Sequence, residues 1–229
     1  MPETQPHTLN HFALVRFTSA YWASPPEARR QIRTDWLARL AGAGEAMHLY
    51  QAFGIEAGLD LIVWTAIRSE ATDVPMGFFE RMARAYAGSR AYVEMSTALW
   101  GFTKPSQYTK TRSTQELDPF ETRALPYLVM YPFVKTSEWY LHTREERANM
   151  MFEHIKIGKQ YPDITQLLLY STGLQDQEFV VVYETADLLK FSQLVTELRS
   201  TQGRPYTLRD TPLHTAVRMA DEAALESWL

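Results

Sequence analysis

The sequence contains no cysteine, and this absence excludes disulfides, thiolate metal sites and cysteine nucleophiles. The chain also lacks an apolar run of the roughly 20 residues that a membrane-spanning helix needs. Its first ten residues, MPETQPHTLN, have neither the basic region nor the apolar segment of a signal peptide. We therefore expect a cytoplasmic protein without a membrane span.

A strong excess of charge is missing as well. The formal net charge is -4 and no long basic run occurs, so we do not expect a nucleic-acid partner. Apolar residues are plentiful, at 45% of 229 residues, which is enough for a packed core. A chain of this length forms one large domain or two domains of about 110 residues each.

The hydrophobic pattern predicts the same order of elements, β-α-β-β-α-β, in each half of the chain. In the first half, strands and helices are expected at residues 11–18, 24–40, 47–53, 59–67, 75–87 and 92–102. In the second half they are expected at residues 127–133, 143–158, 164–170, 178–184, 187–199 and 206–217. Ser24 is a candidate N-cap, and Thr143 and Glu146 have the spacing of a capping box.

Individual residues repeat as well. Trp22 corresponds to Trp139, and Gly54 corresponds to Gly173. Two similar halves predict an α+β fold of tandem ferredoxin-like repeats. We place the first half at residues 1–103, a polar linker at 104–125 and the second half at 126–229.

The second half holds the candidate site residues. His154 lies at the margin of a core-facing helical stripe, predicted at Ala148, Met151, Phe152 and Ile155. A histidine there can ligate a metal or haem iron, although a lone helical histidine is more often an ordinary core or surface residue. The first half has no helical histidine at the matching place, and this asymmetry points to the second half.

The strand at residues 131–135 and the amide of Gln166 supply further candidate residues for a site with His154. Tyr131, Phe133 and Lys135 alternate along one strand face, and Tyr131 and Lys135 are roughly 13 Å apart, the width of a porphyrin. The alternative is that Tyr131 is an ordinary core residue and that Lys135 is a solvated residue at the end of the strand. Gln166 begins an otherwise apolar strand, where it is either a buried amide that needs a partner or an exposed first residue.

Four motifs in order resemble the chlorite dismutase family. They are Tyr131-Pro-Phe-Val-Lys135, Glu138-Trp-Tyr140, Met150-Met-Phe-Glu-His154 and Tyr170-Ser-Thr-Gly-Leu174. The resemblance covers about residues 126–219, and it extends more faintly over the first half. It implies a dimeric α+β barrel of two ferredoxin-like halves, and a homo-oligomer that is most often a pentamer.

The resemblance also implies roles for the candidate residues. His154 would be the proximal ligand of a haem-type iron, and Gln166 takes the distal position where chlorite-degrading members carry an arginine. An amide lacks the charge and the hydrogen-bonding fork of a guanidinium. Those members also carry a glutamate that supports the proximal histidine, and the stretch 200–203 has no acid.

A distal glutamine with a Tyr-Pro-Phe-x-Lys strand resembles the coprohaem decarboxylase branch instead. There iron coproporphyrin III is both substrate and redox cofactor, and hydrogen peroxide drives the loss of carbon dioxide from two propionates to give haem b. The resemblance makes Tyr131 the catalytic residue, through a tyrosyl radical. It makes Tyr131, Phe133, Lys135 and Gln166 the substrate-binding residues, with Lys135 on a propionate.

Besides a purely structural ferredoxin-like oligomer, two other functions stay open on the sequence. One is a chlorite dismutase, which converts chlorite to chloride and dioxygen. The other is a non-catalytic haem-binding protein, which would have no need of a phenol at Tyr131. Two propionate contacts of the decarboxylases have no clear counterpart here. Arg204 can take the place of one, and Lys110 and Arg112 are candidates for the other.

Overall fold

The computed structural model describes residues 7–104, 114–121, 124–220 and 222–227. The chain forms two compact units. The first unit contains residues 1–103, 119–122 and 215–229, and the second contains residues 104–118 and 123–214. The division at 103/104 and 125/126 stays a prediction, because compactness of the folded chain does not show which segments fold alone.

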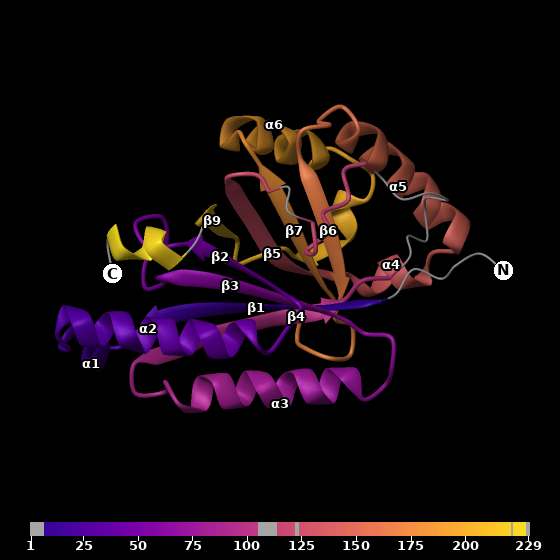
Figure 1. The fold of residues 1–229 in the computed structure, drawn as a ribbon. Helices are drawn as coiled ribbons and strands as arrows, with labels where there is room; N and C mark the ends of the chain where they lie inside the picture. Colours follow the sequence, from indigo (N-terminus) through magenta and orange to yellow (C-terminus); the bar gives the residue numbers. More distant parts are fainter. Residues whose placement is uncertain (1–6, 105–113, 122–123, 221, 228–229) are drawn as a thin grey trace. The chain divides into compact units, whose positions relative to one another are not determined.

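The first unit is an antiparallel sheet with helices on one face (Figure 1). Its strand order is β4-β1-β3-β2, and β9 pairs with β2. Its core lies between the sheet and α2 and α3, where Trp36, Leu40 and Phe78 are fully buried. The elements are β1 (Thr8–Phe17), α1 (Ser19–Trp22), α2 (Pro26–Ala41), β2 (Ala46–Gln51), β3 (Leu61–Arg68), α3 (Val74–Ala87), β4 (Val93–Phe102), β9 (His214–Arg218) and η2 (Glu222–Ser227).

The second unit repeats this arrangement. Its strand order is β8-β5-β7-β6, which matches β4-β1-β3-β2 of the first unit strand for strand. The elements are β5 (Tyr127–Lys135), α4 (Ser137–Leu141), α5 (Arg144–Gly158), β6 (Thr165–Tyr170), β7 (Phe179–Thr185), α6 (Leu188–Leu198), η1 (Arg204–Tyr206) and β8 (Thr207–Arg209). The predicted α+β fold of tandem ferredoxin-like repeats is confirmed.

Local signals in the sequence set several of these boundaries. The capping box at the start of α5 is confirmed, because Glu146 N–H donates to Thr143 Oγ1 and Thr143 N–H donates to a Glu146 carboxylate oxygen. Gly54 and Gly173 have φ of +83° and +76° in equivalent hairpins, a backbone region that favours glycine. Ser24 is not the N-cap of α2, since Pro25 takes that position without a side-chain bond.

The last extended segment differs from its prediction. A single stretch was expected at residues 206–217, and the structure has two short strands, β8 and β9, instead. The reason is pairing, because β8 bonds to β5 while β9 bonds to β2, and one straight strand cannot serve both.

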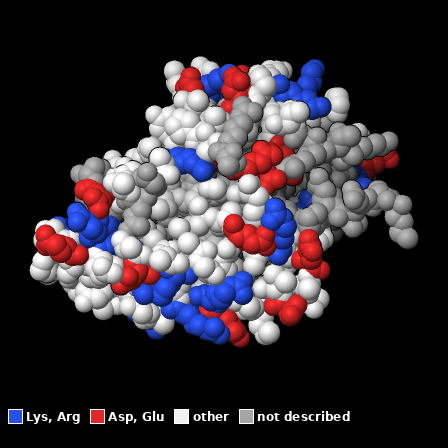
Figure 2. All heavy atoms as spheres, viewed as in Figure 1, with Lys and Arg blue, Asp and Glu red and all other residues white. Residues whose placement is uncertain are grey.

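In the part of the chain that the structure describes, no helix is long and apolar enough to cross a bilayer. On the face drawn in Figure 2, acidic and basic side chains are interspersed.

Candidate functional site

The register of the second unit places three of the predicted residues on one sheet face. Tyr131 on β5 lies opposite Val181 on β7, which lies opposite Leu168 on β6. Opposite residues of antiparallel strands share a face, and so does every second residue along a strand. Phe133 and Gln166 therefore point to the same side as Tyr131. The core cluster on this side includes side chains of α5 and α6.

The helices cover this face only in part. Gln166 is exposed and the apolar side chain of Leu168 is 38% exposed, although both belong to the helix-covered side. The intervening residues Leu167 and Leu169, on the other side of β6, are 4% and 0% exposed. The helices therefore leave part of this sheet face open to solvent.

His154 comes from α5, one helical turn beyond the buried Met150. Burial, and then the nearby charge of Lys135, lower the pKa of His154 to about 4, so the imidazole is neutral at pH 7. Within the described residues, its side chain makes no hydrogen bond. A half-buried neutral imidazole with unused ring nitrogens fits the role of an iron ligand.

Lys135 ends β5 close to His154. Its Nζ atom lies 4.4 Å from the ring centroid of Trp139 and 3.4 to 3.5 Å from Thr207 Oγ1 and Gly203 O. Burial and the repulsion of Arg204 lower the pKa of Lys135 to about 8. It forms no ion pair with any residue that the structure describes. A partly desolvated cation without a carboxylate partner is suited to a ligand carboxylate.

Tyr131 is half-buried, and burial raises its pKa. The neighbouring phenol of Tyr183 acts on this pKa in the opposite direction, and the charges of Asp210, Arg199 and Arg204 also reach the Tyr131 hydroxyl. Arg204 Nη1 donates to Asp210 Oδ2 at 2.7 Å. Sequence reasoning missed Tyr183 and Asp210. For Tyr183, the available signal in the sequence was the alternation of Val181 and Tyr183 along β7, which places both side chains on one face.

The other two predicted residues lie on the same face at its edges. Phe133 stacks on Phe179 with ring centroids 4.7 Å apart and an interplanar angle of 16°. The backbone of Gln166 is held by Gln115 O and by the N–H of Leu117, at 2.7 and 2.9 Å. The structure therefore places Lys135 near His154, with Tyr131, Phe133 and Gln166 on the adjoining sheet face. Lys110 and Arg112 lie outside the described residues.

The first unit provides an internal comparison. Helix α5 begins 118 residues after α2, and the N-caps Thr18 and Thr136 are also 118 residues apart. By this offset, three of the candidate side chains match apolar residues of the first unit that are at most 3% exposed. Tyr131 matches Ala13, Lys135 matches Phe17 and His154 matches Trp36. Where the first unit packs a closed apolar core, the second places ionisable groups and leaves its sheet partly open.

One sequence prediction for α5 was wrong. Phe152 was placed in the core-facing stripe, and it is 69% exposed, while Met150 is the buried residue of the helix. Apolar residues occur on several sides of α5, so their spacing does not single out one face.

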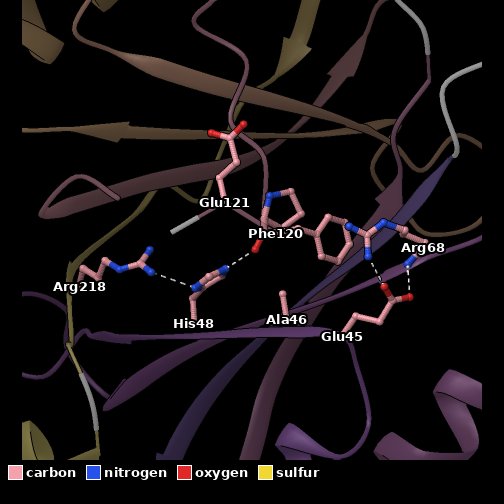
Figure 3. A pocket seen from close by; sticks show the side chains of 8 residues that line it. Glu45, Ala46, His48, Arg68, Phe120, Glu121 and Arg218 are labelled. Carbon is pink, nitrogen blue, oxygen red and sulfur yellow. Dashed lines mark hydrogen bonds and ion pairs between the residues drawn. The ribbon is translucent and has the colours of Figure 1, made fainter. Parts of the chain in front are cut away.

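A hollow with a volume of about 470 Å³ lies in the first unit, away from the candidate residues (Figure 3). His48 stands at its centre, where Arg218 donates to Nδ1 at 3.0 Å and Nε2 contacts Pro119 O at 2.7 Å. Arg68 pairs with Glu45. These polar groups bind one another, and none of them was predicted from the sequence as a site residue.

Comparison with known proteins decides the family. A family model described as chlorite dismutase matches residues 26–219. The chain belongs to the chlorite dismutase family. The match spans both units, so it covers the ferredoxin-like repeat as well as the candidate site.

Individual members of this family can be compared in sequence and in fold. A coprohaem decarboxylase of Mycolicibacterium smegmatis is 29% identical over 178 residues, which are 76% of this chain and 73% of the relative. Chlorite dismutase of Candidatus Nitrospira defluvii in complex with imidazole is 21% identical, with a TM-score of 0.82 over 98% of this chain and 95% of that chain. A mutant of the same enzyme has a TM-score of 0.83 at 21% identity, over 98% and 96% of the two chains. The two structures show a common fold.

Proposed function

We propose that this family member is a coprohaem decarboxylase. It would use hydrogen peroxide to convert two propionates of iron coproporphyrin III to vinyl groups, giving haem b. The observation that carries the proposal is a half-buried phenol, Tyr131, on a partly open sheet face, with Lys135 at the end of the same strand and His154 close to Lys135. The similarity to the coprohaem decarboxylase of Mycolicibacterium smegmatis supports it. A carrier that only binds haem would not need this phenol.

Each side chain has a distinct role in this proposal. His154 would hold the iron through its neutral imidazole. Lys135 would neutralise one propionate, and Arg204 would neutralise a second by giving up its ion pair with Asp210, since buried carboxylates need a partner. Phe133 and Leu168 would provide apolar contact for the macrocycle, and Gln166 would supply an amide on the face opposite His154. The bound iron porphyrin supplies the redox chemistry with peroxide.

Tyr131 would carry out the step on the propionate. Its phenoxyl radical takes a hydrogen atom from the propionate side chain, and this restores the phenol. The side chain then loses carbon dioxide and one further electron to become a vinyl group. Each propionate gives up two electrons in total, and one hydrogen peroxide accepts them to form two water molecules. Two cycles account for both vinyl groups of haem b.

Chlorite dismutase activity is the second candidate, because the matching family carries that name and both compared structures are chlorite dismutases. Gln166 argues against it, since a neutral amide does not hold an oxyanion as a guanidinium does. Among the residues that the structure describes, no carboxylate forms a hydrogen bond or an ion pair with His154, so none of them supports the imidazole as an electron donor.

Assembly and location are further parts of the proposal. We propose that the protein forms a homo-oligomer, with a pentamer favoured, and that it acts in the cytoplasm.

The proposed reaction is tested on the purified full-length chain. The chain is loaded with iron coproporphyrin III, hydrogen peroxide is added in steps, and the porphyrin mass is followed. We expect two successive losses that match decarboxylation. In a parallel sample, chlorite is added and dioxygen is measured, and we expect little or none. Rapid dioxygen release with an unchanged porphyrin mass would favour the second candidate.

Lys135 predicts how substrate affinity depends on pH. In the protein without substrate, burial lowers the pKa of Lys135 to about 8, so the ammonium is present below that pH and is lost above it. A bound substrate carboxylate would stabilise the ammonium and raise this pKa. The Kd for iron coproporphyrin III should therefore increase by up to about tenfold per pH unit above pH 8. Absorbance titrations at several pH values measure this.

The matched control for this pH effect is Lys135→Arg. A guanidinium stays charged throughout this range, so the rise in Kd should be absent in the variant. An equal rise in both proteins would assign the pH effect to another group.

A further inference from the structure

A short piece of the predicted linker pairs with β6 at the residue proposed for the distal side of the iron. Residues 115–117 belong to the second unit, and Glu116 forms a parallel bridge with Gln166. The N–H of Gln166 donates to Gln115 O at 2.7 Å, and the N–H of Leu117 donates to Gln166 O at 2.9 Å. Both backbone groups of Gln166 are therefore held by this segment.

The side chain of Gln115 anchors the segment to the rest of the second unit. Its Nε2 atom lies 2.8 Å from Tyr161 O, 3.1 Å from Ile164 O and 3.2 Å from Gly158 O. A carbonyl oxygen only accepts hydrogen bonds, so three of them can converge only on the donor end of an amide. The two hydrogens of this nitrogen are shared among the three acceptors. These contacts fix the position of the side chain and the way its amide faces.

The three carbonyls belong to the elements that carry two of the candidate residues. Gly158 is the last residue of α5, about one helical turn beyond His154, and the last carbonyls of a helix lack partners within it. Ile164 directly precedes β6 and lies two residues before Gln166. Gln115 thus joins the end of the helix that carries the candidate iron ligand to the start of the strand that carries the distal amide.

The amide of Gln166 is not held through its own side chain. That side chain is exposed and, among the residues that the structure describes, has no hydrogen-bond partner. Its place over the sheet face therefore follows from its backbone, because a strand side chain stands roughly perpendicular to the sheet at its own Cα. The backbone N–H of Gln166 is bonded to Gln115, so the anchor acts at this residue directly.

We propose that Gln115 is a positioning residue that ties the backbone of Gln166 to the helix of His154 and so holds the distal amide in its place in the site. The inference rests on the proposed function, since it needs an iron porphyrin bound between His154 and Gln166. Loss of the Gln115 amide leaves Gln166 in the strand but loosens it. A small ligand on the iron then loses part of its hydrogen bond from the distal side.

The anchor is tested first without any porphyrin. Hydrogen exchange of the full chain is followed at the Gln166 N–H by mass spectrometry with electron-transfer fragmentation. Gln115→Met keeps a side chain of similar length without a donor, and exchange should become on the order of tenfold faster, because local opening breaks fewer hydrogen bonds. The matched control is Gln160→Met. Gln160 is exposed in the turn between α5 and β6, so its loss should leave the exchange unchanged.

The iron-loaded protein provides a readout that a purely structural role would not move. Ferrous iron coproporphyrin III is bound to the chain, carbon monoxide is added, and the C–O stretch is measured by infrared spectroscopy. A hydrogen-bond donor near the ligand oxygen lowers this frequency, so Gln166→Leu should raise it. Gln115→Met should raise it by a smaller amount, and Gln160→Met should not change it.

A second variant keeps the test independent of the fold of the first. Gln115→Asn retains the donor on a side chain one carbon shorter, so both readouts should lie between those of the wild type and Gln115→Met. Thermal unfolding checks each variant. Should Gln115→Met fail to fold, a Gln115→Asn protein with wild-type exchange and a wild-type C–O stretch overturns the inference.

The outcomes separate this inference from the proposed function. Unchanged exchange at Gln166 in Gln115→Met overturns the positioning role, and so does faster exchange with an unchanged C–O stretch, because the anchor would then be structural only. If both readouts move while the wild type does not decarboxylate, the positioning role stands and the proposed reaction falls. If the wild-type chain binds no iron porphyrin, both fall together.

Discussion

Tyr131→Phe is expected to bind iron coproporphyrin III with wild-type affinity and to fail in decarboxylation. The substitution removes one hydroxyl and keeps the ring, so contacts with Val181 and the core cluster persist. The hydroxyl acts only in the chemical step, and its loss should lower kcat by on the order of a thousandfold. Porphyrin mass after addition of peroxide measures the product, and an absorbance titration measures binding.

Tyr127→Phe is the matched control for this variant. Tyr127 begins the same strand and alternates with Tyr131 onto the same face, but four residues away. Its variant should turn over normally. Normal turnover in Tyr131→Phe would refute the tyrosyl mechanism, while weak binding in that variant would show that the phenol serves the porphyrin as a contact.

His154→Ala should weaken binding of the iron porphyrin by about a hundredfold or more and abolish turnover. Loss of groups that merely support a metal ligand already costs about 10- to 100-fold in affinity, and removal of the ligand itself should cost at least as much. The absorbance spectrum of the bound porphyrin should change as well, because the iron loses its imidazole. Added imidazole should restore part of the spectrum by occupying the space left by the side chain.

His142→Ala is the control for the effect of removing a histidine. His142 lies just before α5, half-buried against the ring of Tyr206 at 4.9 Å, and it has no proposed role. Its variant should keep the wild-type spectrum. A wild-type spectrum in His154→Ala would show that another group binds the iron.

Much of the fold could be predicted because its signals are local. The capping box of Thr143 and Glu146 and the turn glycines at 54 and 173 act within a few residues, so they show directly in the sequence. The repeat order follows from hydrophobic periodicity, which each element carries by itself. The same reasoning failed for Phe152, because the side that a helix buries depends on what packs against it.

The candidate site was predicted by resemblance to a family, residue by residue. What the sequence could not show is the neighbourhood of these residues. Tyr183 and Asp210 act on Tyr131 from 52 and 79 positions further along the chain, through strand register and a loop. The lowered pKa of Lys135 also depends on burial, which is a property of the folded chain.

By itself, the sequence determined two β-α-β-β-α-β halves, a chain without thiol chemistry, and a helical histidine, His154, that has no counterpart in the first half. Only the tertiary structure decided that the sheet face bearing Tyr131 stays partly open, and that a second phenol stands beside it. The reason is that periodicity tells which side of one element is apolar. Exposure and hydrogen bonding depend instead on which elements meet, and that is settled by strand pairing and packing across long stretches of chain.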